Sequence, residues 1–186
     1  MNRFAVTETK LAGLRCVQRQ PLGDARGFLV RLFCADELRD AGWVWPVAQV
    51  NHTLTRHAGT VRGLHFQRAP HAEAKLVSCL RGEVWDVAVD LRRGSPTFLG
   101  WHAQHLSSGN GMALLIPPGC AHGFQTLSDE VEMLYVHSAA HEAGAEGGLH
   151  PLDPTLALPW PLPVGLLSAR DDAHPKLTDE FNGVKL

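Results

Sequence analysis

Most of the chain consists of short stretches in which apolar and polar residues alternate. Glycine or proline residues stand at the ends of these stretches. This spacing is typical of an all-β domain, because a strand that is half buried in a sheet exposes every second side chain. In the clearest example, Arg81 and Gly82 separate two runs of apolar residues. The pattern predicts strands over 75–80 and 83–90 that pair as a hairpin.

Three more strands are predicted further along the chain. One spans 111–116 and is closed by a Pro-Gly turn, and two others span 121–127 and 131–136 as a second pair across an Asp-Glu turn. One helix is predicted around 35–40, ended by Gly42. Many short strands with almost no helix predict an all-β fold, a sandwich or barrel of the double-sheet jelly-roll kind.

The C-terminal part of the chain, from about Leu149, is rich in proline. We expect it to wrap over the barrel in extended form without adding a second domain. The whole chain has 186 residues, of which 45% are hydrophobic and 19% charged, as in an ordinary globular domain. A single domain over 1–186 is therefore expected, with a core large enough to need neither a metal nor a disulfide for folding.

Charge, the N-terminal segment and cysteine content bear on the kind of binding partner and on the cellular location. The 17 Lys and Arg residues against 19 Asp and Glu residues give a net charge of -2, which offers no basic surface for nucleic acid or an anionic membrane. Residues 1–8 lack the apolar stretch of a secretory signal, and no segment is long and apolar enough to span a bilayer. The four cysteines are scattered without a CxxC pair, which favours reduced thiols and a cytoplasmic location.

One strand residue has an unusual position. Asp86 shares a strand face with Val84 and Ala88, whereas Trp85 and Val87 point to the other face. Two interpretations are open: an edge or turn position, or an inward carboxylate that requires a buried partner.

The histidines and the single tyrosine supply the first candidates for chemistry. The chain has 11 histidines and one tyrosine, Tyr135. An isolated histidine is more often a packed or surface residue than a catalyst or ligand. His65 and His122, however, each lie in a short segment that contains glycine residues close to the histidine. These two are the histidines of interest.

The segment from Gly111 through Pro117 and Gly119 to His122 resembles the second motif of the cupin superfamily. The first cupin motif usually carries a His-x-His pair and a glutamate that bind a metal, and residues 65–67 here end in glutamine instead of the second histidine. A metal site needs three or four imidazole or carboxylate ligands that converge on one point. No bound metal is therefore expected.

A closer resemblance covers nearly the whole chain in one register, from about Gly23 to Asp171. The sequence is similar to the dTDP-4-dehydrorhamnose 3,5-epimerase family in the blocks 62–67, 75–90, 93–98, 116–124, 153–154 and 159–161. The resemblance implies a cupin-type jelly roll that uses no metal or other cofactor and forms a homodimer. It also implies an enzyme that inverts C3 and C5 of a nucleotide-linked 4-keto-6-deoxy sugar.

The same resemblance assigns four catalytic residues. It implies that His65 is the base, Tyr135 the acid on the opposite face of the sugar, and Lys75 a cation near the ketone oxygen. Asp171 matches the carboxylate that orients the histidine. Outside this pattern, Tyr135 would be a core or interface aromatic, Lys75 a strand end, Asp171 a surface turn and His65 a loop residue. The chemistry itself requires such a set, since a proton next to a ketone needs a base, a group that stabilises the enolate, and an acid to return it.

Further residues match the family's contacts to the nucleotide sugar. Guanidinium groups suit phosphate oxygens, and polar side chains suit the sugar and base. By resemblance the substrate-binding residues are Arg26, Phe28, Arg31, Gln49, Asn51, Arg62, His122, His141, Glu146 and Arg170. We also hypothesise that Asp86 supports His122 as a buried carboxylate–imidazole pair, which requires the two side chains to lie within hydrogen-bond reach.

Three positions depart from the family pattern. Arg31 stands where a glutamate is common, Ala140 and His141 where a pair of aromatics is usual, and His150 near the place of a tryptophan. The reaction centre is preserved while the nucleotide and sugar-rim positions are altered. The substrate implied is dTDP-4-dehydro-6-deoxyglucose. An epimerase for one carbon or for another nucleotide sugar, a non-catalytic sugar-binding cupin and a metal-dependent cupin oxygenase are the alternatives.

Overall fold

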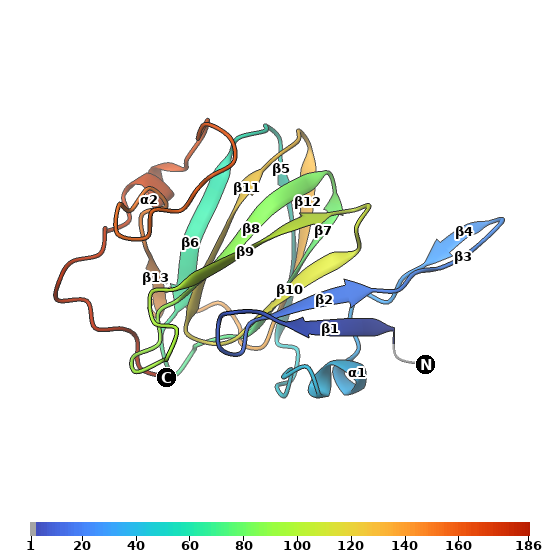
Figure 1. The fold of residues 1–186 in the computed structure, drawn as a ribbon, viewed down its shortest axis with the longest axis horizontal. Helices are drawn as coiled ribbons and strands as arrows, with labels where there is room; N and C mark the ends of the chain where they lie inside the picture. Colours follow the sequence, from blue (N-terminus) through green and yellow to red (C-terminus); the bar gives the residue numbers. More distant parts are fainter. Residues whose placement is uncertain (1–2) are drawn as a thin grey trace.

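Two antiparallel sheets face each other, and a hairpin projects from one side of them (Figure 1). The computed structural model describes residues 3–186, so Met1 and Asn2, which begin the N-terminal segment considered above, lie outside it. Within residues 3–186 no helix is long and apolar enough to cross a membrane.

The first sheet has the strand order β1-β2-β10-β7-β12-β5. Its strands are β1 (Phe4–Glu8), β2 (Arg15–Arg19), β10 (Met112–Ile116), β7 (Lys75–Arg81), β12 (Val131–His137) and β5 (Gln49–Thr55). The second sheet has the order β13-β6-β11-β8-β9. Its strands are β13 (Glu146–Gly148), β6 (Val61–Gln67), β11 (Cys120–Thr126), β8 (Glu83–Asp90) and β9 (Trp101–Ser107). The hairpin is β3 (Leu22–Asp24) with β4 (Gly27–Leu29), and the helices are α1 (Ala35–Arg39) and α2 (Ala169–Asp172).

The all-β prediction is confirmed, and the predicted strands and helix α1 lie within one or two residues of their expected ends. The predicted hairpin of β7 with β8 is wrong. The chain passes at Gly82 from one sheet to the other, so β7 pairs with β10 and β12 while β8 pairs with β9 and β11. Strands β11 and β12 also lie in different sheets.

Burial explains this crossing. Val77 of β7 and Val84 and Ala88 of β8 belong to one cluster of buried side chains between the sheets. If β7 and β8 paired edge to edge in one sheet, these apolar faces would lie side by side, and each would still need cover. Placed in opposite sheets, the two strands cover each other's apolar face.

The C-terminal segment covers the outer face of the second sheet, as the proline-rich composition predicts. Leu149, Leu156 and Leu158 are buried in a cluster with Val87 and Val89 of β8. Figure 1 shows this segment, in orange and red, passing over the side of β6 and β13. It also brings α2 into contact with β6.

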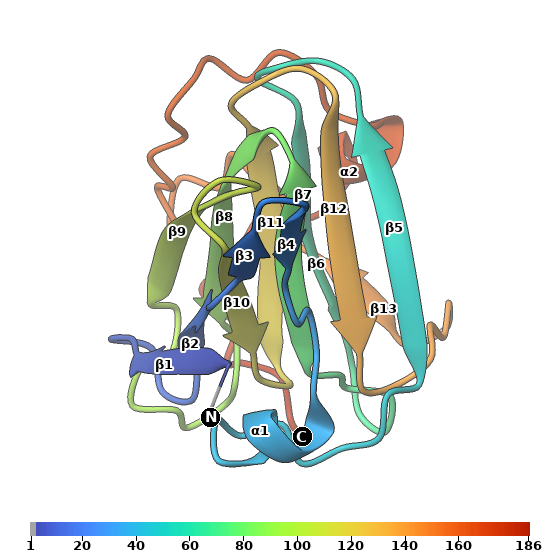
Figure 2. The same ribbon diagram turned by 90° about the vertical axis from the view of Figure 1, so that its right-hand side faces the viewer.

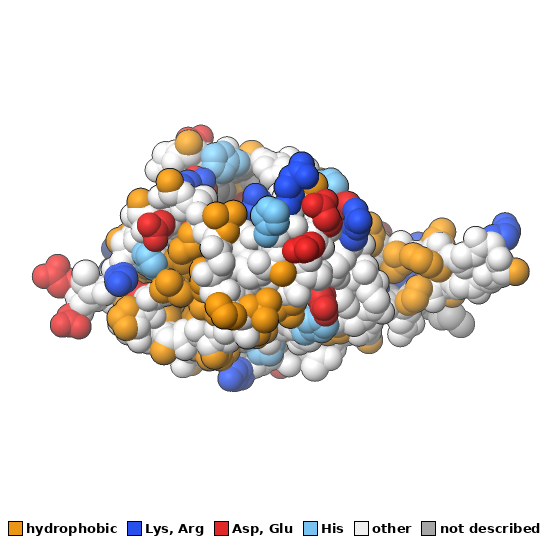
Figure 3. Space-filling model, turned by 90° about the horizontal axis from the view of Figure 1, so that it is seen from above, with side chains coloured by type: hydrophobic (Ala, Val, Ile, Leu, Met, Phe, Trp, Pro, Cys, Tyr) orange, Lys and Arg blue, Asp and Glu red, His pale blue; other side chains and the backbone are white. Residues whose placement is uncertain are grey.

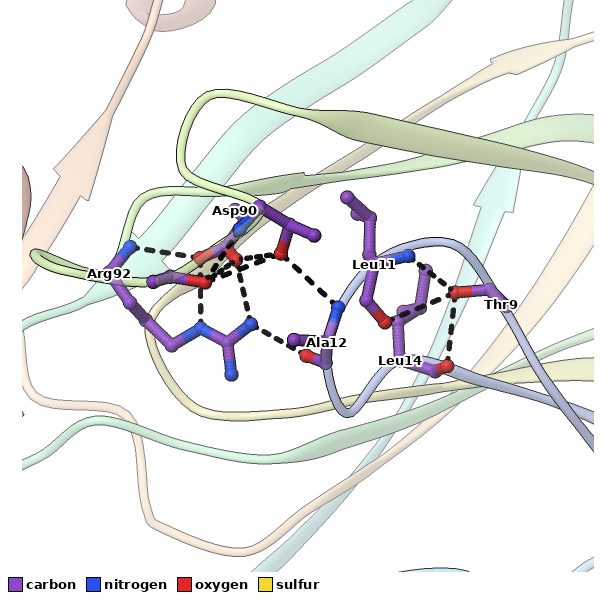
Figure 4. Close-up of polar contacts among 8 residues, drawn as sticks. Thr9, Leu11, Ala12, Leu14, Asp90 and Arg92 are labelled. Atoms are coloured by element: carbon purple, nitrogen blue, oxygen red, sulfur yellow. Dashed lines mark hydrogen bonds and ion pairs between the residues drawn. The ribbon is translucent and has the colours of Figure 1, made fainter.

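A buried carboxylate anchors the loop after β1 to the loop after β8 (Figure 4). Asp90 accepts hydrogen bonds from Nε and Nη2 of Arg92, both at 2.8 Å, and from the hydroxyl of Thr97 at 2.6 Å. The Arg92 guanidinium also donates to the backbone oxygen of Ala12 at 2.6 Å. Burial alone would raise the pKa of Asp90, but these hydrogen bonds lower the pKa to about 2.

Candidate active site

A cavity of about 310 Å³ opens between the two sheets and receives side chains from both. Figure 2 looks onto β12 and β5 of the first sheet, with β6 and β13 of the second behind them. The predicted site residues along the cavity wall are Gln49, Asn51, Arg62, His65, Lys75, His122, Tyr135, His141 and Glu146. The fold thus brings together residues that are up to 97 positions apart, from 49 to 146.

His65 lies on β6 and contacts a buried carboxylate of the C-terminal segment. Its Nε2 is 2.7 Å from Oδ1 of Asp171, and Oδ2 accepts a hydrogen bond from the backbone N–H of Gly63 at 3.2 Å. Burial by itself would raise the pKa of Asp171, but the hydrogen bond and charge of His65 hold this pKa below its ordinary value. The ionised carboxylate accepts Nε2–H, which leaves Nδ1 of His65 as the free nitrogen.

Two local features allow this pairing. The side chain of Ser168 caps α2 by accepting a hydrogen bond from the backbone N–H of Asp171 at 3.0 Å. Gly63 has a φ of +122°, and a Cβ at this position would lie 2.6 Å from Cα of Gly123 on the next strand. A side chain at position 63 would therefore separate β6 from β11 and displace His65.

His122 lies on β11 directly beside His65 in the register of the sheet. Its Nε2 is 2.9 Å from Oδ2 of Asp86, whose side chain is 0% exposed. This distance is within hydrogen-bond reach, as the hypothesis required, so Asp86 is an inward carboxylate and not an edge or turn residue. Burial raises the pKa of Asp86, and the charge and hydrogen bond of His122 oppose that rise.

Tyr135 faces these histidines from the opposite sheet. It lies on β12, packs against the core between the sheets, and its ring centroid is 6.1 Å from that of His122. Burial raises the pKa of Tyr135 well above its ordinary value. At neutral pH the hydroxyl therefore keeps its proton and can donate it.

Lys75, at the start of β7, is buried beside two residues that the sequence analysis did not identify. Its Nζ is 3.0 Å from Oε1 of Glu73, and Oε2 of Glu73 is 2.8 Å from Nδ1 of His137. The signal for His137 was its place two positions after Tyr135 in a strand, which puts both side chains on one face. Glu73 precedes β7, so strand periodicity did not apply to it.

The mouth of the cavity carries a chain of polar contacts. The backbone N–H of His141 donates to Oε1 of Gln49 at 3.0 Å, and Nε2 of His141 is 3.4 Å from Oε2 of Glu146. Arg170 forms an ion pair with the same carboxylate. Arg62 lines both this cavity and a neighbouring one of about 690 Å³, which Arg170 also lines. The mouth is therefore suited to a polar, charged ligand.

The predicted residues Arg26, Phe28 and Arg31 do not lie at the cavity of their own chain. Arg26 and Phe28 belong to the hairpin of β3 and β4, which projects away from the barrel (Figure 1). Phe28 is 75% exposed, Arg26 is paired with Asp24, and Arg31 is paired with Glu37 of α1. The strands of the hairpin pair with each other and with neither sheet, so nothing turns these side chains toward the cavity.

One group of side chains has the composition of a metal site. Ligand atoms of His65, Asp171 and His174 lie within 4.8 Å of one another. Nε2 of His65 and Oδ1 of Asp171 already form a hydrogen bond of 2.7 Å, which a metal ion between them would have to replace. Gln67 accepts a hydrogen bond from the backbone of Glu142 and donates to backbone oxygens, so its amide serves the structure of the cavity wall.

Comparison with known proteins identifies close relatives over nearly the whole chain. The family model described as dTDP-4-dehydrorhamnose 3,5-epimerase matches residues 8–179. A dTDP-4-dehydrorhamnose 3,5-epimerase of Sinorhizobium fredii is 39% identical over 91% of this chain and 87% of its own length. A dTDP-4-dehydrorhamnose 3-epimerase of Streptomyces niveus is 41% identical over 80% of this chain and 72% of its own length.

A solved structure agrees with the fold. The dTDP-6-deoxy-D-glucose-3,5-epimerase of Legionella pneumophila, in complex with dTDP-4-keto-L-rhamnose, superposes with a TM-score of 0.91 at 35% identity. The match covers 98% of this chain and 98% of the other.

Proposed function

This chain belongs to the dTDP-4-dehydrorhamnose 3,5-epimerase family, and on that premise we propose that it converts dTDP-4-dehydro-6-deoxy-D-glucose into dTDP-4-dehydro-L-rhamnose. The reaction inverts C3 and C5, the two carbons next to the ketone. The observation that carries the proposal is the approach of His65 and Tyr135 to one cavity from opposite sheets. Inversion requires a base on one face of the sugar and an acid on the other.

His65 is the proposed base. Its Nδ1 takes the proton from the carbon next to the ketone, and the electron pair of the C–H bond moves into the enolate. The imidazolium that forms is stabilised by the carboxylate of Asp171 at 2.7 Å. Lys75 lies on the wall of the same cavity, and we propose that its ammonium group stabilises the enolate oxygen.

Tyr135 is the proposed acid. Its hydroxyl gives its proton to the carbon from the other face, and the ketone forms again. Solvent then restores the proton of Tyr135 and removes that of His65. The hydroxyl is protonated at neutral pH, so it is available as a donor at the start of each turnover.

Binding of the nucleotide diphosphate is assigned to the mouth of the cavity. Arg62 and Arg170 supply guanidinium groups for phosphate oxygens. Gln49, Asn51 and His141 supply polar contacts beside them. The mechanism uses no metal or other cofactor, because base, acid and enolate-stabilising cation are all side chains of this protein.

The proposal is tested by conversion of dTDP-4-dehydro-6-deoxyglucose by the wild-type protein and two variants. We expect His65→Ala and Tyr135→Phe each to lose at least about 10²-fold in kcat, the usual contribution of a positioned acid or base. Both variants should keep the melting temperature within a few degrees of the wild type. Wild-type rates in either folded variant would refute the assigned roles.

We also propose a homodimer in the cytoplasm. The projecting hairpin exposes Leu22, Phe28 and Leu29, and Figure 3 shows hydrophobic side chains gathered on this projection. Docking of the hairpin on a second copy would bury them and would bring Arg26 toward a neighbouring cavity. The four cysteines are free, which suits a reducing compartment. Sedimentation equilibrium should give twice the chain mass, and an active monomer would contradict the dimer.

A further inference from the structure

Glu73 and His137 are buried in the cavity wall, and the proposed mechanism uses neither. Their side chains are 8% and 12% exposed, and both line the cavity. The carboxylate of Glu73 contacts His137 through one oxygen and Lys75 through the other. His137 and Lys75 are also direct neighbours in the register of β12 and β7, so they lie side by side on one face of the sheet.

The charge of Glu73 determines which nitrogen of His137 is free. Burial alone would raise the pKa of Glu73, but the hydrogen bond from His137 and the charge of Lys75 hold this pKa below its ordinary value. Glu73 is therefore a carboxylate that accepts Nδ1–H of His137 at 2.8 Å. An imidazole that donates through Nδ1 has an acceptor lone pair at Nε2.

Nε2 of His137 has room for another partner. Its neighbour is Nδ2 of Asn51 at 3.5 Å, which is long for a hydrogen bond. Both residues line the cavity. The ring of His137 lies 6.1 Å from that of Tyr135, centroid to centroid, on the same strand. His137 therefore lies on the wall of the cavity beside the proposed acid.

We propose that His137 is a specificity-determining residue whose Nε2 accepts a hydrogen bond from a hydroxyl group of the sugar, and that Glu73 is the positioning residue for it. The inference rests on the proposed function, because a sugar between His65 and Tyr135 is what presents hydroxyl groups to this wall. A phosphate oxygen does not fit this nitrogen, since both atoms are acceptors. The pair therefore recognises the sugar and leaves the diphosphate to the arginines at the mouth.

Binding experiments separate the sugar contact from the nucleotide contact. Calorimetry would measure Kd for dTDP-glucose, which has sugar hydroxyl groups but no ketone, and for dTDP, which has no sugar. In His137→Asn the shorter amide can still donate to Glu73 but no longer reaches the cavity as Nε2 does. We expect the Kd of dTDP-glucose to rise about 3- to 10-fold, the usual range for one hydrogen bond, and that of dTDP to change less than twofold.

The matched control is His52→Asn. His52 lies on β5, and its Nε2 is 3.0 Å from Oε2 of Glu132, but this pair is outside the cavity. We expect neither Kd to change in the control. Equal changes for both ligands in His137→Asn, or no change for dTDP-glucose, would overturn the specificity role.

Glu73→Gln tests the positioning role. If Glu73 acts through His137, this variant should raise the Kd of dTDP-glucose by a similar factor, and the double variant should show no further rise. Losses that multiply in the double variant would overturn the positioning role. If Glu73→Gln does not fold, Glu73→Asp replaces it in the same cycle. Turnover of the 4-keto sugar by the wild type is measured separately, so its absence would refute the proposed function without deciding these binding ratios.

Discussion

Replacing Asp171 with asparagine changes one charge and almost no volume, at the point where the proposed base is held. In the wild type both carboxylate oxygens accept: Oδ1 from Nε2–H of His65 at 2.7 Å, and Oδ2 from the backbone N–H of Gly63 at 3.2 Å. Asparagine has one oxygen and one NH₂ group. Either Nε2–H of His65 or the backbone N–H of Gly63 must therefore face the NH₂ group, which is also a donor.

The fixed backbone decides the outcome. Gly63 N–H cannot change its proton, so the asparagine oxygen turns toward it and the NH₂ group faces His65. Nε2 of His65 must then accept, and the proton moves to Nδ1, the nitrogen proposed to remove the substrate proton. The base is lost together with the carboxylate that stabilised the imidazolium. We expect kcat to fall by about 10³-fold, within the range of about 10²- to 10⁴-fold for a positioned base, and KM to change much less.

The assay is the rate of conversion of dTDP-4-dehydro-6-deoxyglucose, with denaturant unfolding measured in parallel. Asp172→Asn is the matched control, since this neighbouring carboxylate in α2 is 71% exposed and its recorded partner is His150, at 3.6 Å. The control should keep wild-type kcat. A wild-type kcat in folded Asp171→Asn, or equal losses in both variants, would refute the tautomer argument.

Three further predictions concern the catalytic acid Tyr135, the pH dependence of the stability that Asp90 contributes, and the effect of metal removal on kcat. Tyr135→Phe should still exchange substrate protons with solvent through His65 but without inversion, visible as deuterium in unreacted sugar; loss of this exchange would count against separate base and acid. The folded-state pKa of Asp90, about 2, lies below the unfolded value of about 3.9, so its stabilisation of about 2 kcal/mol is present above pH 4 and lost as pH falls toward 2. Urea unfolding should show this decline, and Asp90→Asn should show less of it. Dialysis against EDTA should leave kcat unchanged, and restoration of a lost rate by Zn²⁺ or Mn²⁺ would contradict a metal-free site.

Local sequence patterns predicted the strands and placed Asp86 on the strand face of Val84 and Ala88, because both depend on alternation along one strand. They left open whether this carboxylate is an edge residue or points inward, which the structure decides. The same patterns could not predict which strands pair. Alternation shows that β7 and β8 each have an apolar face, but a hairpin and a crossing between sheets satisfy it equally. The choice depends on the burial of both faces together, a property of the whole barrel.

Some residues of the site were predicted from the sequence and others were missed, for a similar reason. His65 and Asp171 are 106 positions apart, and only the family resemblance connected them. Glu73 and His137 were missed because each looks like an ordinary polar residue near a strand end until the fold brings it to Lys75. The resemblance also assigned Arg26 to the substrate site. In the structure Arg26 lies on the hairpin of β3 and β4, which projects away from the cavity of its own chain.

The central claim, proton removal and return at two carbons, is tested most directly by the reaction in heavy water. The wild-type protein is incubated with dTDP-4-dehydro-6-deoxyglucose in D₂O, and NMR measures deuterium at C3 and C5. Because Tyr135 exchanges its proton with solvent between turnovers, the account predicts an inverted product that carries deuterium at both carbons. Inversion without deuterium, or no deuterium at either carbon with folded protein, would contradict it.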